Sequence, residues 1–291
     1  MLYPFRVLNP TTIEEATSEL VRLGDRARVY AGGTELLLLH RYGLIRLDTI
    51  VDVKRISALR GISKNGRALR IGALLTHHQL ELHPMVRECL PAFAYAESRI
   101  ANIRVRNQGT LGGNLCFNDP HSDPGTVLLV YDAMVIIAGS TGERRMALED
   151  FFVGTYETAL KPGELLVEVE VPLLPERWKS SYLRVHRLER PTLGVAAVAR
   201  WLQGRLDGVR LAVGCVGPWP LRLTDLEKRL VGTDLKEAGQ IVSEAEDYLR
   251  EILEPTEDIL GSADYKLTIT RVLLNRALGE TWSGNGAEAN G

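Results

Sequence analysis

The sequence predicts an α+β protein with more than one domain. The chain has 291 residues, more than one small hydrophobic core needs. Its first 55 residues alternate strand-like and helix-like segments, which is the order of a β-α-β unit. Beyond Pro175 strand-like segments come first and helix-like segments follow, which favours a smaller α+β domain. We therefore expect two subdomains at 1–55 and 56–174, a C-terminal domain at 175–282 and a disordered tail at 283–291.

The first subdomain begins with a predicted helix at 11–24. Threonines precede it, glutamates lie in its first turn and Gly24 ends it. A buried strand at 27–32, a glycine turn, a helix at 35–43 and a second strand at 49–54 complete the unit.

The second subdomain is predicted from the change between strand-like, helix-like and turn-forming segments along residues 56–174. We expect a strand at 68–76, helices over 76–100 and a long ordered loop at 107–126, since that stretch is rich in glycine, asparagine, aspartate and proline. Strands are predicted at 127–139 and 164–172, the latter from its alternation of apolar and acidic residues. In the C-terminal domain we predict strands at 181–188, 193–202 and 209–217 and helices at 237–253 and 263–278.

Composition excludes several classes of function. The formal net charge is −2 with no basic stripe, so we expect no nucleic-acid partner. The longest apolar stretch is interrupted by Asp132 and is too short to span a membrane. Three widely spaced cysteines favour a reducing compartment. The segment MLYPFRVLNP has no apolar core of a signal peptide, so we expect a cytoplasmic location.

Two glycine segments are the candidates for ligand binding: Ala31–Glu35 and Gly109–Asp123. Neither contains a P-loop or a GxGxxG motif. Glycines nevertheless let backbone N–H groups approach an anion closely. We expect Thr34 to cap the following helix, the leucines 36–39 to bury it, and Thr110–Asn114 to form a second nest of N–H groups. Taken alone, AGGTE is more often only a tight turn, and the asparagines and aspartates of the second segment are standard turn formers.

The order of these motifs resembles a known family. AGGTEL at 31–36, VRNQGTLGGNL at 105–115 and DPHSDP at 119–124 match motifs of the FAD-binding medium subunit of the molybdenum hydroxylases, the xanthine dehydrogenase and carbon monoxide dehydrogenase family. The likeness continues through GELLVEVEVP and GSADYKLTITRVLLNRAL and covers nearly the whole chain.

The resemblance implies a fold and a set of cofactor contacts. The fold would be the two-subdomain FAD-binding fold of the vanillyl-alcohol oxidase and p-cresol methylhydroxylase flavoproteins, followed by a smaller α+β domain. By position in the motifs, the residues implied to contact FAD are Ala31, Gly32, Gly33, Thr34, Glu35, Thr110, Gly112, Gly113, Asn114, Ser122, Asp123, Leu166 and Arg184.

The chain also departs from the family pattern. Arg184 stands where many members have a lysine, and the two side chains are not equivalent. Pro191 and Thr192 replace an aspartate found in many members, which affects the exposed face of the flavin. Three cysteines cannot supply the four ligands of an added iron–sulfur cluster.

The resemblance implies a role in electron transfer. FAD would be bound non-covalently. A small subunit with two [2Fe–2S] clusters and a large molybdopterin subunit would be partners in a dimer of heterotrimers. Electrons would pass through FAD to NAD+, a quinone or another acceptor. We expect no catalytic residue and no metal site in this chain. The alternatives are a self-contained FAD-dependent oxidase of the same fold, or an FAD-binding module without a redox role.

Other reactive side chains are expected to be structural. His77, His78 and His83 lie close in sequence, but no carboxylate or cysteine completes a metal site. Cys116 is expected to be a packed small hydrophobe. Asp119 either orients the second glycine segment or only makes a turn.

Overall fold

The computed structural model describes residues 4–186 and 189–282, so the predicted disordered tail lies outside the described residues. The chain forms two compact units. The N-terminal unit comprises residues 1–80, 102–118 and 133–172, and the C-terminal unit comprises 81–101, 119–132 and 173–291. The described helices include none that is long and apolar enough to cross a lipid bilayer. The α+β class is confirmed, whereas the domain boundaries at 55 and 174 stay predictions.

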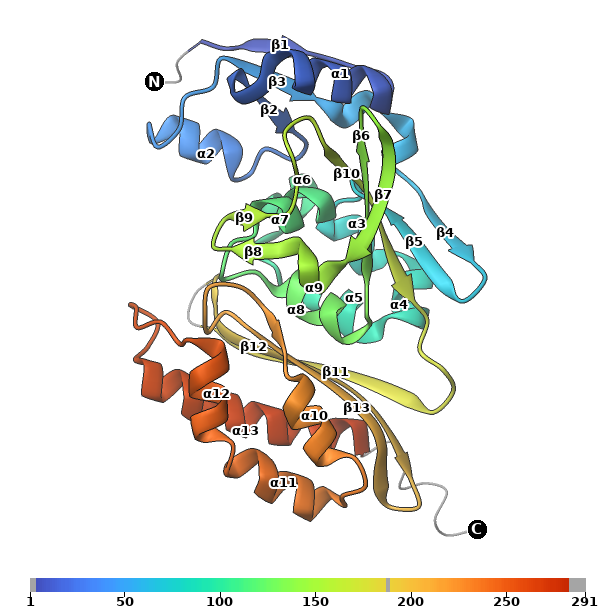
Figure 1. Cartoon of the computed structure of the whole chain (residues 1–291), viewed down its shortest axis with the longest axis vertical. Coiled ribbons are helices and arrows are strands. Elements are labelled where there is room, and N and C mark those ends of the chain that lie inside the picture. Colours follow the sequence, from blue (N-terminus) through green and yellow to red (C-terminus); the bar gives the residue numbers. More distant parts are fainter. Residues whose placement is uncertain (1–3, 187–188, 283–291) are drawn as a thin grey trace. The chain divides into compact units, whose positions relative to one another are not determined.

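The N-terminal unit combines a parallel and an antiparallel sheet (Figure 1). The parallel sheet has the order β1-β3-β2, and a five-stranded antiparallel sheet has the order β4-β5-β10-β6-β7. Its strands are β1 (Arg6–Leu8), β2 (Ala27–Tyr30), β3 (Thr49–Asp52), β4 (Ile62–Asn65), β5 (Ala68–Gly72), β6 (Met134–Gly139), β7 (Gly142–Ala147), β8 (Phe152–Gly154), β9 (Glu157–Thr158) and β10 (Leu165–Pro172). Its helices are α1 (Ile13–Leu23), α2 (Leu36–Arg41), most of α3 (His77–Leu82), α6 (Ile103–Gln108), α7 (Leu111–Phe117), α9 (Leu148–Phe151) and the short 3-10 helices η1 (Gly24–Arg26), η2 (Val53–Arg55) and η3 (Ser57–Leu59).

The predicted β-α-β opening is confirmed. Strands β2 and β3 are parallel, with Tyr30 opposite Asp52 at their carboxyl ends. Helix α1 begins where Thr12 accepts a hydrogen bond from the Glu15 amide at 3.1 Å and ends at Gly24, whose φ is +53°. Its apolar face packs with β3, β6 and β10 in one buried core. The parallel sheet is therefore held from one side by α1.

Helix α2 differs from the prediction. The leucines 36–39 were expected to bury it, but its one buried residue is His40, which packs edge-on against Phe5 with ring centroids 5.5 Å apart. Thr34 does not cap this helix either, because the N-cap position is Glu35 and no side chain caps it. The four leucines stay at least partly exposed, so the histidine is the residue of this helix that reaches the interior.

The predicted loop at 107–126 is mostly helical. Thr110 caps α7 by accepting the Gly113 amide at 3.1 Å, and Asn118 ends the helix in the left-handed conformation at φ +47°. The Asn118 side chain then donates to the carbonyls of Gly154 and Glu157, at 2.7 and 3.1 Å. Helix α8 (Asp123–Val130) follows, so the strand predicted at 127–139 is wrong up to residue 130 and right for β6.

The C-terminal unit is an antiparallel sheet with helices on both faces. The sheet order is β11-β12-β13-β14. Its strands are β11 (Trp178–His186), β12 (Pro191–Leu202), β13 (Arg205–Gly214) and β14 (Leu221–Arg222). Its helices are α4 (Pro84–Cys89), α5 (Pro91–Arg99), α8, α10 (Thr224–Leu230), α11 (Leu235–Ser243), α12 (Glu246–Leu253) and α13 (Ala263–Trp282).

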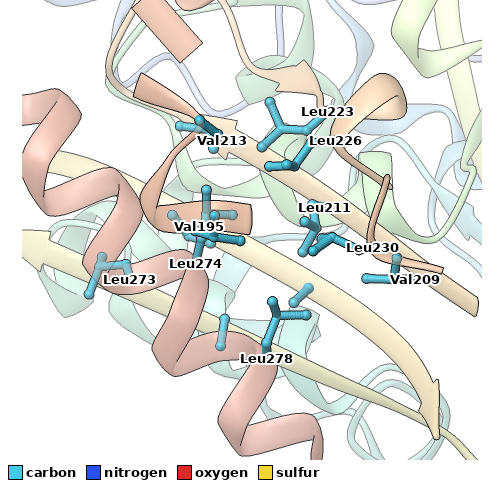
Figure 2. Packing of buried hydrophobic residues seen from close by; sticks show 14 of the residues in the cluster. Val195, Val209, Leu211, Val213, Leu223, Leu226, Leu230, Leu273, Leu274 and Leu278 are labelled. Atoms are coloured by element: carbon cyan, nitrogen blue, oxygen red, sulfur yellow. The ribbon is translucent and has the colours of Figure 1, made fainter. Parts of the chain in front are cut away.

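The central strand β12 is buried on both faces. Figure 2 shows Val195 of β12 and Leu211 and Val213 of β13 packed against leucines of α10 and α13. The residues that alternate with these along each strand point to the other face of the sheet, where α8 lies. A Cβ at Gly214, for example, would overlap the Thr126 side chain of α8. Strand β12 therefore reads as a continuous apolar run, as expected for a strand covered on both sides.

Candidate functional site

The first glycine segment lies at the carboxyl edge of the parallel sheet. It follows β2 directly, and Gly33 adopts φ +74°, which favours glycine. A Cβ at Gly33 would also overlap the ring of Tyr30, lying 2.9 Å from its Cζ atom. The backbone conformation therefore favours glycine here, and the tyrosine ring fills the space that a side chain would occupy.

The two glycine segments, far apart in sequence, meet in the N-terminal unit. A Cβ at Gly32 would overlap the carbonyl of Gln108 and lie 2.9 Å from the Cα atom of Gly109. On the other side of this backbone, His77 donates its amide hydrogen to the Gly109 carbonyl at 3.1 Å. A Cβ at Gly109 would lie 2.9 Å from the His77 ring. The sequence-predicted segments are thus brought into backbone contact, and the buried His77 supports them.

The first segment presents unused hydrogen-bond donors. Within the described residues, the backbone N–H groups of Gly32, Gly33 and Thr34 have no protein acceptor. All three residues are partly exposed. Successive amides in a loop with a left-handed residue form a concavity suited to an anion. Ala31 and Glu35 flank these residues in the same partly exposed loop.

The second segment differs from the expected second nest, because most of its amides already have protein acceptors. The Leu111 amide donates to Leu75 O at 3.0 Å and the Gly112 amide to Ala73 O at 2.9 Å. The Gly113 amide is taken by the capping hydroxyl of Thr110 described above. These amides are used because α7 begins against the end of β5 rather than facing solvent.

The glycines of the second segment have different surroundings. Gly112 is buried, and a Cβ there would lie 2.6 Å from the Cβ of Ala73, so its smallness serves internal packing. Gly113 is exposed, and a Cβ there would meet the Thr110 hydroxyl alone, at 2.9 Å. Asn114 next to it is partly exposed. Gly113 and Asn114 are therefore open to a ligand.

Leu166 lies buried near the start of β10, opposite Ile137 of β6. The pairing of β10 with β6 is irregular between Leu166 and Glu168, and the carbonyl of Val167 accepts the Ala73 amide at 3.0 Å. The bulge therefore ties β10 to the residue against which Gly112 packs.

A buried polar cluster in the C-terminal unit contains two further predicted residues. Arg184 of β11 donates from Nη1 to Asp123 Oδ2 at 2.8 Å and to the Arg99 carbonyl at 2.7 Å. The side chains of Arg184 and Asp123 are each 3% exposed. Tyr182 donates its hydroxyl hydrogen to the other carboxylate oxygen, Oδ1. Asp123 is thus paired on both oxygens, as a buried charge requires.

Tyr182 is the residue of this cluster that sequence reasoning missed. Burial, reinforced by the negative charge of Asp123, raises the pKa of the Tyr182 hydroxyl well above its ordinary value of 10.0. The phenol is therefore a permanent hydrogen-bond donor to the carboxylate. One signal was present in the sequence: Tyr182 and Arg184 are two residues apart on a strand and so share a face.

Ser122, the residue before α8, is contacted through its backbone. The Cys215 thiol lies 3.9 Å from the Ser122 carbonyl. Burial raises the pKa of Cys215 well above its ordinary value, and burial raises that of Cys116 to about 12. Both thiols therefore stay protonated and neither is a reactive thiolate.

Asp119 makes a turn in the segment before α8 and also pairs with a distant arginine, so it combines its two expected roles. Its Oδ1 accepts the His121 amide at 2.8 Å and its Oδ2 lies 3.4 Å from Arg190 Nη1. The ring nitrogen Nδ1 of His121 lies 3.1 Å from the carbonyl of Pro191. Pro191 and Thr192, noted as departures in sequence, thus begin β12 beside this histidine. Across the described ranges no group of three or more His, Cys, Asp or Glu side chains is arranged to hold a metal ion.

Comparison with known proteins identifies the family. Residues 3–174 match the FAD binding domain in molybdopterin dehydrogenase, and residues 182–281 match the CO dehydrogenase flavoprotein C-terminal domain. The carbon monoxide dehydrogenase medium chain of Hydrogenophaga pseudoflava is 34% identical over 94% of this chain and 96% of its own length. The glyceraldehyde dehydrogenase medium chain of Sulfolobus acidocaldarius is 29% identical over 96% of this chain and 99% of its own.

Solved structures agree with these relatives. Carbon monoxide dehydrogenase from Hydrogenophaga pseudoflava matches with a TM-score of 0.93 at 34% identity, covering 97% of this chain and 99% of the matched one. Quinoline 2-oxidoreductase from Pseudomonas putida 86 matches with a TM-score of 0.89 at 30% identity, covering 98% and 99%. The chain therefore belongs to the FAD-binding medium subunits of the molybdenum hydroxylases, the family of carbon monoxide dehydrogenase and xanthine dehydrogenase.

Proposed function

We propose that this chain binds FAD non-covalently and that the loop Ala31–Glu35 holds the diphosphate. The observation that supports this most directly is that the N–H groups of Gly32, Gly33 and Thr34 have no acceptor in the part of the chain that the structure describes. A diphosphate offers oxygen acceptors to successive amides, and water is displaced without leaving the donors unpaired. Gly113 is exposed and lies in the segment that touches this loop. The ligand could therefore also contact the surface at Gly113.

The other predicted contacts stay proposals from the resemblance. They are Ala31, Glu35, Thr110, Gly112, Asn114, Leu166, Ser122, Asp123 and Arg184. For Gly112 the structure supports an indirect role, through the packing of α7 on Ala73. For Asp123 and Arg184 it supports a rigid pair, since each fixes the other inside the C-terminal unit.

The proposed role is electron relay within a complex. Bound FAD supplies the ability to exchange electrons singly or in pairs. The chain's own residues bind and orient the cofactor. The support for a complex is that relatives matching along the whole chain are named medium chains of dehydrogenases. We propose as partners a small subunit with two [2Fe–2S] clusters, which delivers electrons, and a large molybdopterin subunit, which oxidises the substrate. The assembly would be a dimer of heterotrimers in the cytoplasm, with NAD+, a quinone or another molecule as final acceptor.

The mode of FAD binding can be tested on the full chain. The purified protein is denatured and filtered, and the visible spectrum of the filtrate is recorded. We expect a yellow filtrate, which means non-covalent FAD. A colourless filtrate from a yellow protein would show covalent attachment, and a colourless protein that takes up no added FAD would overturn the proposal.

The exposed glycine provides a site-specific test. Gly113→Val should weaken FAD binding roughly tenfold or more, about 1.4 kcal/mol, because the added side chain occupies the bare surface. The exposed Gly61, where a Cβ meets no atom within 4 Å, gives the matched control Gly61→Val. Equal FAD affinity in the two variants would show that Gly113 has no role in binding FAD.

The relay is tested in the whole complex. Substrate added without oxygen should bleach the flavin absorbance when all three chains are present, and not when this chain is alone. If the isolated chain's flavin is reduced by an aldehyde, a purine or an alcohol at the rate of turnover, the protein is an oxidase in its own right.

A further inference from the structure

The proposed diphosphate site lacks a positive charge of its own. The loop Ala31–Glu35 contributes N–H donors, and its charged side chain, Glu35, is a carboxylate. Helix α2 has six residues, too few for a strong helix dipole. In the second segment the amides of Leu111, Gly112 and Gly113 already have acceptors. A cation from another element would therefore add to the binding of a diphosphate at this loop.

Two cations near the parallel sheet lie at opposite ends of its strands. Arg28 is held at the amino end of β2, where its Nη1 donates to the carbonyls of Asp25 and Ala27 at 2.8 and 2.9 Å. Lys54 lies two residues beyond the carboxyl end of β3, in the short helix η2. The loop Ala31–Glu35 follows the carboxyl end of β2, which is parallel to β3 and paired with it. Lys54 is therefore at the edge of the sheet where the loop lies.

The side chain of Lys54 is held in a defined place. Its Nζ lies 3.8 Å from the centroid of the Tyr30 ring and 2.9 Å from Asp52 Oδ2. The Tyr30 ring is also the group that a Cβ at Gly33 would overlap. One aromatic ring thus contacts the lysine ammonium and the middle of the glycine loop. The Lys54 side chain is still 40% exposed, so the ammonium can reach a ligand.

We infer that Lys54 supplies the positive charge for the FAD diphosphate, and that Tyr30 and Asp52 position its ammonium beside the loop. The inference rests on the proposed binding of FAD at Ala31–Glu35. An ammonium has three N–H donors, so pairing with Asp52 leaves donors for phosphate oxygens. The tyrosine ring holds the cation by a cation–π interaction, and Asp52 limits its rotamers. The glycine amides would supply hydrogen-bond donors and the lysine would supply positive charge, and a diphosphate accepts both.

A purely structural role for Lys54 makes a different prediction. Partly exposed ion pairs contribute little to stability. If Lys54 only pairs with Asp52, its replacement should change the unfolding free energy slightly and leave ligand binding as it was. Binding of ligands with and without a diphosphate therefore separates the two roles.

The test uses the full chain freed of flavin, with FAD, ADP and riboflavin as probes. Lys54→Met should weaken both FAD and ADP roughly tenfold, about 1.4 kcal/mol, and leave riboflavin unchanged, because riboflavin has no phosphate. It should also reduce the dependence of FAD affinity on salt, since one charge contact is lost. Lys54→Arg should keep FAD affinity within about threefold. Lys64→Met, at an exposed lysine of β4, is the matched control and should change none of these values.

The outcomes are distinguishable from failure of the proposed function. If the unmodified chain binds FAD and ADP, and Lys54→Met binds both equally well, the inference is overturned and FAD binding stands. Equal weakening of FAD, ADP and riboflavin would also overturn it, because the lysine would then support the loop rather than the phosphates. If the unmodified chain binds no FAD, the proposed function fails first.

Discussion

A methyl group on Gly32 would overlap a backbone carbonyl, whereas one on Gly33 would overlap a side-chain ring. The difference decides how each position can respond to substitution. Tyr30 can rotate away from an added group, but the Gln108 carbonyl is part of the backbone, and the neighbouring Gly109 carbonyl is bonded to the His77 amide. Gly32 is therefore a position at which the first glycine segment approaches the backbone beside the second without space for a side chain.

Gly32→Ala should separate the two segments. We expect a loss of about 1–3 kcal/mol of unfolding free energy from the overlap, together with weaker FAD binding. Urea unfolding and flavin fluorescence measure the two effects. Gly61→Ala, in open surroundings, is the control and should be near neutral. A fully stable Gly32→Ala protein with normal FAD affinity would mean that the contact between the segments is dispensable.

Tyr182→Phe tests the buried cluster of Asp123, Tyr182 and Arg184. The substitution removes one donor from a carboxylate that cannot reach water, so we expect a loss of about 1.5–3 kcal/mol in unfolding free energy. Tyr95→Phe is the matched control, because Tyr95 is 49% exposed and should lose less than about 0.5 kcal/mol. Equal losses in the two variants would show that the Tyr182 hydroxyl adds nothing to the cluster.

At the scale of residues, the sequence indicates local features such as turns but not contacts between residues far apart in the chain. The glycine segments are visible because turns and close approaches select glycine wherever they occur. The pairing of Asp123 with Tyr182 and Arg184 joins positions 59 and 61 residues apart, and no local pattern encodes it. For the same reason the sequence did not indicate that Gly112 is small because of Ala73.

At the scale of elements, the errors have identifiable physical causes. Every residue of α8 is buried, so its apolar run shows no helical period and looks like a buried strand. Helix α7 carries two adjacent glycines, which are poor helix formers, and it forms because Thr110 caps it and Leu111 and Leu115 are buried. Tertiary burial overrides local propensity in both helices.

The turn before β10 illustrates an element fixed by charge. Glu164 accepts hydrogen bonds from Arg144 of β7 at 2.7 and 2.8 Å and from the Lys161 amide at 2.7 Å. The hydrogen bonds from Arg144 are the main cause that lowers the pKa of Glu164 below its ordinary value of 4.5. A carboxylate with a lowered pKa contributes stability above its ordinary value, and this contribution is lost as the pH falls through the folded-state pKa.

Glu164→Gln should therefore destabilise the protein in a pH-dependent way. Near neutral pH we expect a loss of about 1–2 kcal/mol, since a charged acceptor for three donors becomes neutral. The difference from the unmodified protein should shrink as the pH falls below 4.5 and through the lowered folded-state pKa, because the native carboxylate then also becomes protonated. Urea unfolding across pH measures it, with the exposed Glu143→Gln as control. A difference that is constant with pH would assign the effect to packing instead.

At the scale of the whole molecule, sequence order and spatial units do not coincide. The family match to a C-terminal domain covers residues 182–281, yet the C-terminal unit also takes in 81–101 and 119–132. These earlier segments carry α5 and α8, which contain Asp123 and Thr126 and lie on one face of the sheet. The order of strands and helices can be predicted from hydrophobic periodicity and turn residues. The packing of α8 onto a sheet whose strands come later in the chain cannot be predicted in this way.

A fragment of residues 173–282 should consequently fail to fold as a native domain. Without α8 it would expose the face of β11–β13 that carries Tyr182, leave Arg184 without its carboxylate and remove Asp132 from Arg222, which donates to it at 2.6 Å. We expect this fragment to bind a hydrophobic dye and to unfold without a cooperative transition. In the full chain, amides of α8 should exchange with deuterium as slowly as those of β12 and β13. The matched comparison is the full chain under identical conditions. A fragment that unfolds cooperatively, together with an α8 that exchanges rapidly in the full chain, would show that the sheet needs the helices α10–α13 alone and that α8 is a peripheral cover.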